Sequence, residues 1–291
     1  MTDHIIRALS TAGGIRFLAC SVKELSREIC SLQGTSPTAS IALARGLAGG
    51  ALLGALLKSV QRTAIKFEGN GPLRKLIIEA DADGAVRGCA ANPAADVPPV
   101  GDRWNVPEII GRAGFLTVSK DIGTGSLPYQ GMVQLQSSEI GSDLAYYLTE
   151  SEQIPSAVGL GASLDANGEL AHCGGFLVQA LPKADEAEID AIMKNIDALP
   201  PLTELLKEGP AGLLARVAGN IPYTLLETRD LFFRCGCSRT KVERALLTLS
   251  PDNLREMIEH DGGAEVSCEF CRQKYSFDPE ELESLGKTDT P

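Results

Sequence analysis

The sequence predicts an α+β protein with a mainly antiparallel N-terminal domain, a helical linker and a small C-terminal domain that contains four cysteines. Three observations predict this class. Short apolar segments with strand-like alternation, separated by turn residues, fill residues 1–182. Amphipathic helical patterns interrupted by proline follow over residues 183–231. Residues 232–291 then hold two closely spaced pairs of cysteines.

Composition limits both the size of the fold and the kinds of partner. A chain of 291 residues suggests about two domains, and a hydrophobic content of 44% is enough for a sizeable core. The formal net charge of -11 argues against a protein that binds nucleic acid in bulk, because neutralising phosphates requires clustered Lys and Arg. We therefore expect no nucleic-acid partner.

The apolar runs and the scattered cysteines indicate a cytoplasmic protein with no membrane partner. Residues 1–12 lack the continuous apolar stretch of a secretory signal. The longest apolar run, residues 46–57, is too short to span a bilayer and is typical of a buried helix. Four cysteines occur singly, which is unlike a secreted disulfide framework and suits a reducing compartment. They are Cys20, Cys30, Cys89 and Cys173.

The N-terminal domain is expected to consist of strands joined by short turns, with three helices. The predicted strands span residues 14–22, 62–68, 74–80, 85–89, 114–120, 131–136, 156–164 and 170–181. The predicted helices span residues 23–32, 37–60 and 142–150. The second helix has Pro37 at its first turn, and its glycines permit the close approach of a neighbouring element.

His172 beside Cys173 is a pairing that could suggest a catalytic base and nucleophile. However, neighbouring side chains along a strand point to opposite faces, and no carboxylate that would orient the histidine is identifiable. A structural role is favoured for both residues. We therefore predict that the protein is not an enzyme and has no catalytic residue.

The linker, residues 183–231, is expected to be a set of short amphipathic helices whose order depends on the domains at either side. Its helices are broken at Pro200-Pro201, Gly209-Pro210 and Ile221-Pro222. Apolar residues at helical spacing form a stripe that must dock on another surface. The stripe consists of Ile189, Ile192, Met193 and Ile196. An ordinary helical connector is the alternative interpretation.

The four clustered cysteines form a specific motif. One residue separates Cys235 from Cys237, which departs from the usual spacing of two, and two residues separate Cys268 from Cys271. Zinc takes four tetrahedral ligands, and two pairs from separate segments can each supply two of them without straining the backbone. The sequence therefore predicts one Zn²⁺ per chain on these four ligands. Four buried or reactive thiols without a metal are the alternative.

Short elements are expected around these cysteines. The predicted helices span residues 239–249 and 251–260, the second with Ser250 as its cap, and a strand spans residues 273–277. Residues 268–271 are predicted to form a turn. A final helix is entered through Asp278 and Pro279. His260 is read as a helix-end or surface residue, because four cysteines already complete the ligand set.

Three motifs resemble the thirty-three-kilodalton redox-regulated heat-shock chaperone family of bacteria. They are residues 233–238, residues 249–252 after a helical spacer, and residues 268–271. The resemblance extends over essentially the whole chain, and the cysteine spacing is its most specific feature. It implies an ATP-independent holdase that is silent when reduced and zinc-bound, and that binds unfolding client proteins after oxidation by peroxide or hypochlorous acid.

The resemblance also assigns residues and a mechanism. It places the zinc ligands at Cys235, Cys237, Cys268 and Cys271, and it implies zinc release, unfolding of the linker and dimerisation on oxidation. The disulfides expected in this mechanism are Cys235–Cys237 and Cys268–Cys271. Client contacts in the family are diffuse, so no substrate-binding residue is assigned.

The residues make this mechanism physically reasonable. Zinc holds cysteine sulfurs as thiolates, which are the form that oxidants attack. A segment of about sixty residues buries a small core, so metal binding supplies most of its folding free energy, about 10 kcal/mol or more. Loss of the metal is therefore expected to unfold the segment and to remove the docking surface of the linker.

Two other classes of function remain as alternatives. A zinc-ribbon regulator that binds nucleic acid is disfavoured, because residues 232–291 contain 8 Lys and Arg against 12 Asp and Glu. A thiol-disulfide oxidoreductase would need an open metal position or an isolated Cys-Xaa-Xaa-Cys site. Neither alternative explains the linker.

Overall fold

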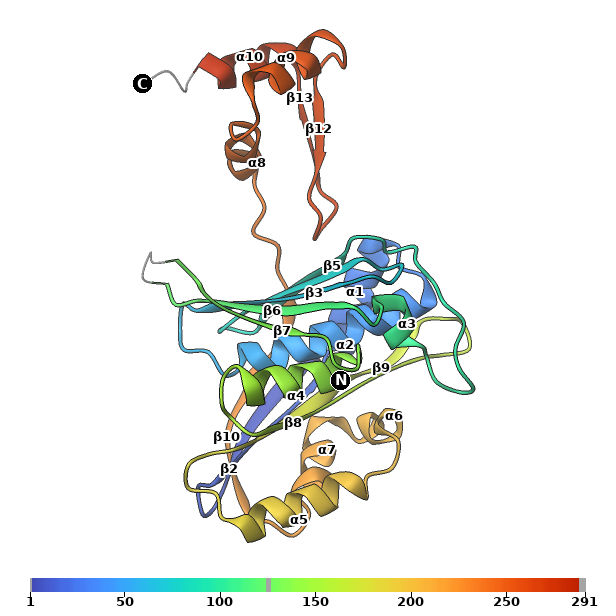
Figure 1. The fold of residues 1–291 in the computed structure, drawn as a ribbon, viewed down its shortest axis with the longest axis vertical. Coiled ribbons are helices and arrows are strands. Elements are labelled where there is room, and N and C mark those ends of the chain that lie inside the picture. The colour runs from blue at the N-terminus through green and yellow to red at the C-terminus, as the bar shows by residue number, and fades with distance from the viewer. Residues whose placement is uncertain (1, 124–126, 288–291) are drawn as a thin grey trace. The chain divides into compact units, whose positions relative to one another are not determined.

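The computed structural model describes residues 2–123 and 127–287, which belong to two compact units. The first unit ends at Arg234, and the second begins at Cys235. Antiparallel sheets and helices make up the first unit, and a two-stranded sheet with short helices makes up the second (Figure 1). The predicted α+β class with mainly antiparallel sheets is confirmed.

The first unit contains two sheets. Its strands are β1 (His4–Ser10), β2 (Ile15–Ser21), β3 (Arg62–Gly69), β4 (Lys75–Asp81), β5 (Ala85–Ala90), β6 (Gly114–Asp121), β7 (Tyr129–Gln134), β8 (Ser156–Leu164), β9 (Leu170–Ala180), β10 (Tyr223–Asp230) and β11 (Phe232–Phe233). Its helices are α1 (Lys23–Gln33), α2 (Pro37–Gly54), α3 (Val106–Ile110), α4 (Ile140–Glu150), α5 (Glu186–Asp197), α6 (Leu202–Leu205) and α7 (Gly209–Ala218). A single 3₁₀ turn, Leu206–Glu208, joins the last two.

The two sheets enclose a helix. One sheet has the strand order β10-β1-β2-β9-β8 and the other β11-β5-β4-β3-β6-β7. All of the pairs are antiparallel except β11 with β5. Helix α2 lies between the sheets and is buried along nearly all of its length (Figure 1). No helix in the described part of the chain is long and apolar enough to cross a membrane.

Helices α5, α6 and α7 cover the other face of the five-stranded sheet (Figure 1). Ile15 and Phe17 of β2 form one side of this second core, and Leu213 and Leu214 of α7 are buried in it. The predicted linker stripe docks here in part, on the first unit, although its docking surface was expected in the C-terminal domain. Ile192 is 3% exposed, and Ile189 and Ile196 are half-buried, but Met193 remains 47% exposed. The stripe is therefore narrower than its four-residue pattern suggested.

Three strands of the first unit, β1, β10 and β11, were not predicted. Residues 223–230 were assigned to short helices, but they form β10 and pair with β1 from His4↔Asp230 to Ser10↔Tyr223. Strand β1 was itself overlooked. Strand β10 is fixed by a partner more than 200 positions away, and such pairing overrides local propensity, whereas β1 also pairs with the adjacent strand β2. The helix predicted to run to residue 60 ends at Gly54 instead.

The second unit is small. It contains α8 (Arg239–Leu246), α9 (Pro251–Glu259), β12 (Ala264–Ser267), β13 (Lys274–Phe277) and α10 (Pro279–Lys287). The two predicted intervening helices, the strand and the final helix are confirmed, whereas β12 was missed. Ser250 caps α9 by accepting a hydrogen bond from the Asn253 amide at 3.3 Å, as predicted. The apolar cluster has only Leu246, Phe277 and Leu282 fully buried among the described residues.

The glycines of α2 permit the close approach of neighbouring elements, as predicted. A Cβ at Gly50 would lie 2.4 Å from Cγ2 of Ile78 on β4, and a Cβ at Gly49 would lie 2.6 Å from Cδ1 of Leu144 on α4. At Gly46 the nearest contact would be 3.1 Å. The glycines therefore lower the helix propensity of α2 but allow it to pack closely against its neighbours.

We predict that Gly50→Ala destabilises the first unit by about 1–3 kcal/mol, because the added methyl group forces Ile78 to move in a packed core. Gly46→Ala is the matched control. Its methyl group meets only side-chain tips at a looser distance, so the gain in helix propensity offsets more of the strain. Urea denaturation of both variants measures the difference, and equal stabilities would contradict close packing at Gly50.

Candidate metal centre

The four clustered cysteines lie together in the second unit. Their sulfurs all lie within 4.8 Å of one another, and each residue is half-buried. The Cys235 and Cys268 sulfurs are 3.7 Å apart, and the Cys237 and Cys271 sulfurs are 3.4 Å apart. No other group of three or more potential metal ligands occurs among residues 2–123 and 127–287. The structure thus brings the four predicted ligands to one point.

Local structure places each pair. Cys235 and Cys237 lie in an extended segment that leads into α8, and the Ser238 hydroxyl caps that helix by accepting from the Lys241 amide at 3.3 Å. Cys268 and Cys271 form the predicted turn between β12 and β13. The Cys268 amide donates to the Gln273 carbonyl, which keeps the turn closed between the paired strands.

The next residue completes this turn. The Arg272 amide donates to the Cys268 carbonyl at 2.9 Å, and Arg272 itself adopts a left-handed backbone with φ of 59°. This conformation is unusual for a residue with a side chain, and it directs the chain sharply into β13. The two sulfurs of the second pair therefore project to the same side of the turn.

The donor set fits a tetrahedral metal ion. Bonds of about 2.3 Å from zinc to sulfur place tetrahedral sulfurs about 3.8 Å apart, close to the separations of 3.7 Å and 3.4 Å found here. Without a cation, burial and hydrogen bonds with the other three thiols raise the pKa of Cys271 to about 12, so its proton is retained. A bound cation supplies the positive charge that four thiolates in this space require.

Two neighbouring side chains contact the cluster, and sequence reasoning did not identify either. The Tyr275 hydroxyl donates a hydrogen bond to the Cys237 sulfur at 3.1 Å. The Lys241 ammonium donates to the carbonyl of Gly236, between the first two cysteines. An aromatic residue in the strand after the second pair was the available signal for Tyr275, but the contact crosses 38 positions of sequence.

The remaining candidates lie apart from the cluster. His260 is exposed at the C-terminal end of α9, in agreement with the prediction. Cys173 is 2% exposed, and burial raises the pKa of its thiol, which argues against a nucleophile beside His172. Burial also raises the pKa of Cys20 to about 12 and the pKa of Cys30 above its usual value. Cys89 is 4% exposed.

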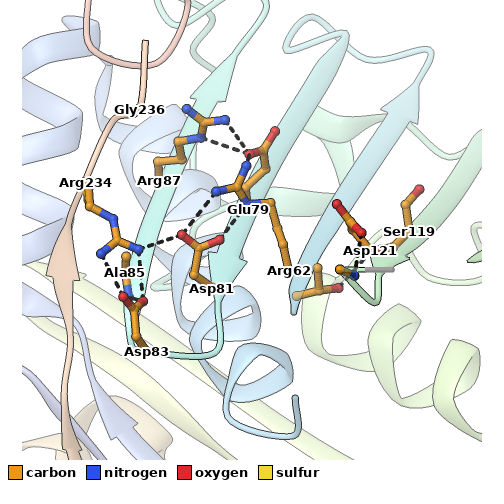
Figure 2. Close-up of polar contacts among 12 residues, drawn as sticks. Arg62, Glu79, Asp81, Asp83, Ala85, Arg87, Ser119, Asp121, Arg234 and Gly236 are labelled. Atoms are coloured by element: carbon orange, nitrogen blue, oxygen red, sulfur yellow. Dashed lines mark hydrogen bonds and ion pairs between the residues drawn. The ribbon is translucent and has the colours of Figure 1, made fainter. Parts of the chain in front are cut away.

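An ion-pair network holds the last residues of the first unit. Strand β11 pairs with β5, and Arg234 then contacts the β4–β5 turn (Figure 2). The Arg234 guanidinium donates to Asp83 at 2.7 Å and to Asp81 at 2.8 Å. On the other side of Asp81, Arg62 donates to both carboxylate oxygens. Although burial alone would raise the pKa of Asp81, these two arginines hold it below its usual value.

This network defines where the chain leaves the first unit. Arg234 immediately precedes Cys235, so the first candidate ligand follows a residue that is anchored by two carboxylates. Arg234 is about half exposed, and exposed ion pairs contribute about 1 kcal/mol or less each. The ion pairs of Arg234 therefore fix the position of the chain but contribute little to the free energy of unfolding. No pattern in the sequence indicated that Arg234 pairs with Asp81 and Asp83.

Comparisons with known proteins agree over the whole chain. The sequence model of the family described as Hsp33 protein matches residues 3–278. A 33 kDa chaperonin of Pelobacter propionicus is 64% identical over 291 residues, covering 100% of this chain and 96% of the relative. A 33 kDa chaperonin of Geobacter sulfurreducens is 51% identical over 287 residues, covering 98% of this chain and 95% of the relative.

A solved structure gives the same result for the fold. The crystal structure of the 33 kDa chaperonin from Thermotoga maritima matches with a TM-score of 0.91 and 33% identity, covering 100% of both chains. Sequence and fold therefore agree, and the resemblance noted from the cysteine motifs is confirmed. The chain belongs to the Hsp33 family of 33 kDa chaperonins.

Proposed function

We propose that this chaperone is an ATP-independent holdase of the cytoplasm, which binds unfolding proteins during oxidative stress and is switched on by oxidation. Membership of a chaperone family supports the class of client. The observation that carries the redox switch is the cluster of four cysteine sulfurs within 4.8 Å, which lies a few residues after the linker. A cytoplasmic location provides the reducing conditions that keep these thiols reduced at rest.

In the resting state, Cys235, Cys237, Cys268 and Cys271 hold one Zn²⁺. The ion keeps all four sulfurs as thiolates and joins two segments that are otherwise separate in sequence. The unit around the site has a small apolar core, with three residues of its cluster fully buried. Such a core supplies little folding free energy, so the unit depends on the metal.

Oxidation forms two local disulfides, Cys235–Cys237 and Cys268–Cys271. Each disulfide closes a very short ring, whereas the metal closes the long loop between Cys237 and Cys268. Closing a loop of that length constrains the unfolded chain by about 3–4 kcal/mol, and the local disulfides do not restore this constraint. The unit therefore loses both its metal and its long-range cross-link in the same event.

Loss of the second unit releases the linker helices from the first unit. In the docked state, α5, α6 and α7 bury the outer face of the five-stranded sheet, including Phe17 and Phe176. Undocking exposes this face together with the apolar sides of the helices. An exposed apolar surface of this extent binds other exposed apolar surfaces. It binds unfolded client proteins, and it also allows two active chains to dimerise.

The other two function classes have less support. A nucleic-acid regulator would need a basic surface, but residues 232–291 carry an excess of acidic side chains. An oxidoreductase would use one reactive cysteine pair, whereas four sulfurs here share one site. No catalytic role, nucleic acid, membrane or ATP enters the proposal.

We predict one zinc ion per chain in protein purified under reducing conditions without chelator, and its release on addition of peroxide. Elemental analysis measures the stoichiometry, and a chromogenic indicator follows the release. Aggregation of a heat-unfolded client is monitored by light scattering in the same samples. Protein that contains no zinc, or that suppresses aggregation equally before and after oxidation, would exclude the proposed switch.

We predict that Cys20, Cys30, Cys89 and Cys173 take no part in the switch, because they are buried, where a cysteine acts as a small apolar side chain. Replacing all four by Ala should lower the melting temperature but preserve activation by peroxide. Cys268→Ser serves as the comparison and should abolish zinc binding. If the fourfold variant no longer responds to peroxide, the redox switch lies in the first unit.

We predict that Ile192→Glu activates the chaperone without oxidation. Ile192 is 3% exposed in the docked helix, and burying an unpaired carboxylate costs several kcal/mol, enough to undock it. Met193→Glu is the matched control, because Met193 is 47% exposed on the same helix. Hydrogen exchange should increase in residues 186–218 of the first variant only, with zinc retained. Undocking without client binding would refute the role of the linker as an inhibitor.

A further inference from the structure

Tyr275 joins the two halves of the cysteine cluster through a direct hydrogen bond to sulfur. Its hydroxyl lies on β13, which follows the second cysteine pair, but it donates to Cys237 of the first pair at 3.1 Å. The ring packs against the small apolar core around Phe277, and the residue is half-buried. The hydroxyl is therefore held in position by the strand and by the core.

Strand pairing fixes the backbone position of Tyr275. Tyr275 pairs with Val266 of β12 in an antiparallel register that also pairs Lys274 with Ser267. This register fixes the distance between the ring and the turn that carries Cys268 and Cys271. The backbone pairing therefore fixes where the ring lies, and the hydroxyl reaches Cys237 from that position.

We propose that Tyr275 is a positioning residue that slows the attack of oxidants on Cys237 and so sets the threshold of the switch. This inference rests on the redox function proposed above. A hydroxyl that donates to a thiolate withdraws electron density from the sulfur lone pair, and that lone pair is the nucleophile. The hydroxyl also occupies one direction from which an oxidant could approach the sulfur.

The reaction that Tyr275 restrains is a two-electron oxidation by a hydroperoxide. The Cys237 lone pair attacks one peroxide oxygen, forming an S–O bond and breaking the O–O bond, and the leaving hydroxide takes a proton from solvent. A neighbouring thiolate then attacks the oxidised sulfur, forming the disulfide and expelling hydroxide, which is also protonated. Two thiolates lose two electrons, and the peroxide becomes two waters or a water and an alcohol. Tyr275 keeps its proton throughout.

The test uses full-length, reduced and zinc-loaded protein. Tyr275→Phe keeps the ring and its packing and removes one oxygen atom, so the expected increase in the rate of zinc release by hydrogen peroxide is about three- to tenfold. Tyr129→Phe is the control, because Tyr129 is 55% exposed on β7 of the first unit. A tight four-thiolate site retains its zinc stoichiometry after this loss.

A second measurement separates the proposal from general loosening of the unit. Brief alkylation with iodoacetamide, read by mass spectrometry at each cysteine, should show faster modification of Cys237 in Tyr275→Phe than in the wild type, with the other three cysteines little changed. Equal acceleration at all four cysteines, with faster amide exchange across residues 235–287, would mean that Tyr275 only supports the fold and would overturn the proposal. Unchanged rates of zinc release would overturn it as well.

A second variant, with the opposite expected effect on the rate of zinc release, keeps the proposal testable if Tyr275→Phe misfolds. A ring-fluorinated tyrosine at position 275 has a more acidic hydroxyl, donates a stronger hydrogen bond and should slow zinc release at neutral pH. Faster or unchanged release would contradict the proposal. Failure of the redox function itself gives a different result, because wild-type protein would then release zinc without gaining the ability to suppress aggregation.

Discussion

The structure of the second unit depends on four sulfurs that meet from two distant segments. Only three residues of its apolar cluster are fully buried in the described residues, so hydrophobic burial supplies little of its stability. The strand pair β12–β13 is short, and a two-stranded hairpin is marginal in water. In the function proposed above, a metal cross-link between Cys237 and Cys268 takes the place of the core that the unit lacks, and the redox state of the four sulfurs controls whether the unit is folded.

Residues 219–234 join helix α7 to the second unit. That chain belongs to both sheets, because β10 pairs with β1 and β11 pairs with β5. Arg234 anchors its end through Asp81 and Asp83 (Figure 2). These contacts are exposed at the surface and individually weak. The anchor therefore fixes the register of the chain and contributes little to its stability.

Sequence reasoning succeeded where a feature is local and failed where it depends on distant partners. The cysteine pairs, the cap at Ser250 and the glycines of α2 each act within a few residues or require only a small side chain. Strand β10 was taken for helix because its pairing with β1 lies more than 200 positions away. The contacts of Tyr275 and Arg234 likewise join distant segments, and no periodic pattern in the sequence indicates them.

The linker helices differ in how firmly they are docked, and this difference suggests where release begins. Helix α5 has one fully buried residue, Ile192, whereas α7 has five, including Leu213 and Val217. At about 1.5–3 kcal/mol for each buried apolar side chain, α7 is held far more strongly. The two helices are coupled, because the side-chain amide of Asn195 in α5 donates to the last carbonyls of α7, those of Val217 and Ala218. Release of α5 would therefore remove these two hydrogen bonds from the C-terminal end of α7, which is still held by its own buried residues.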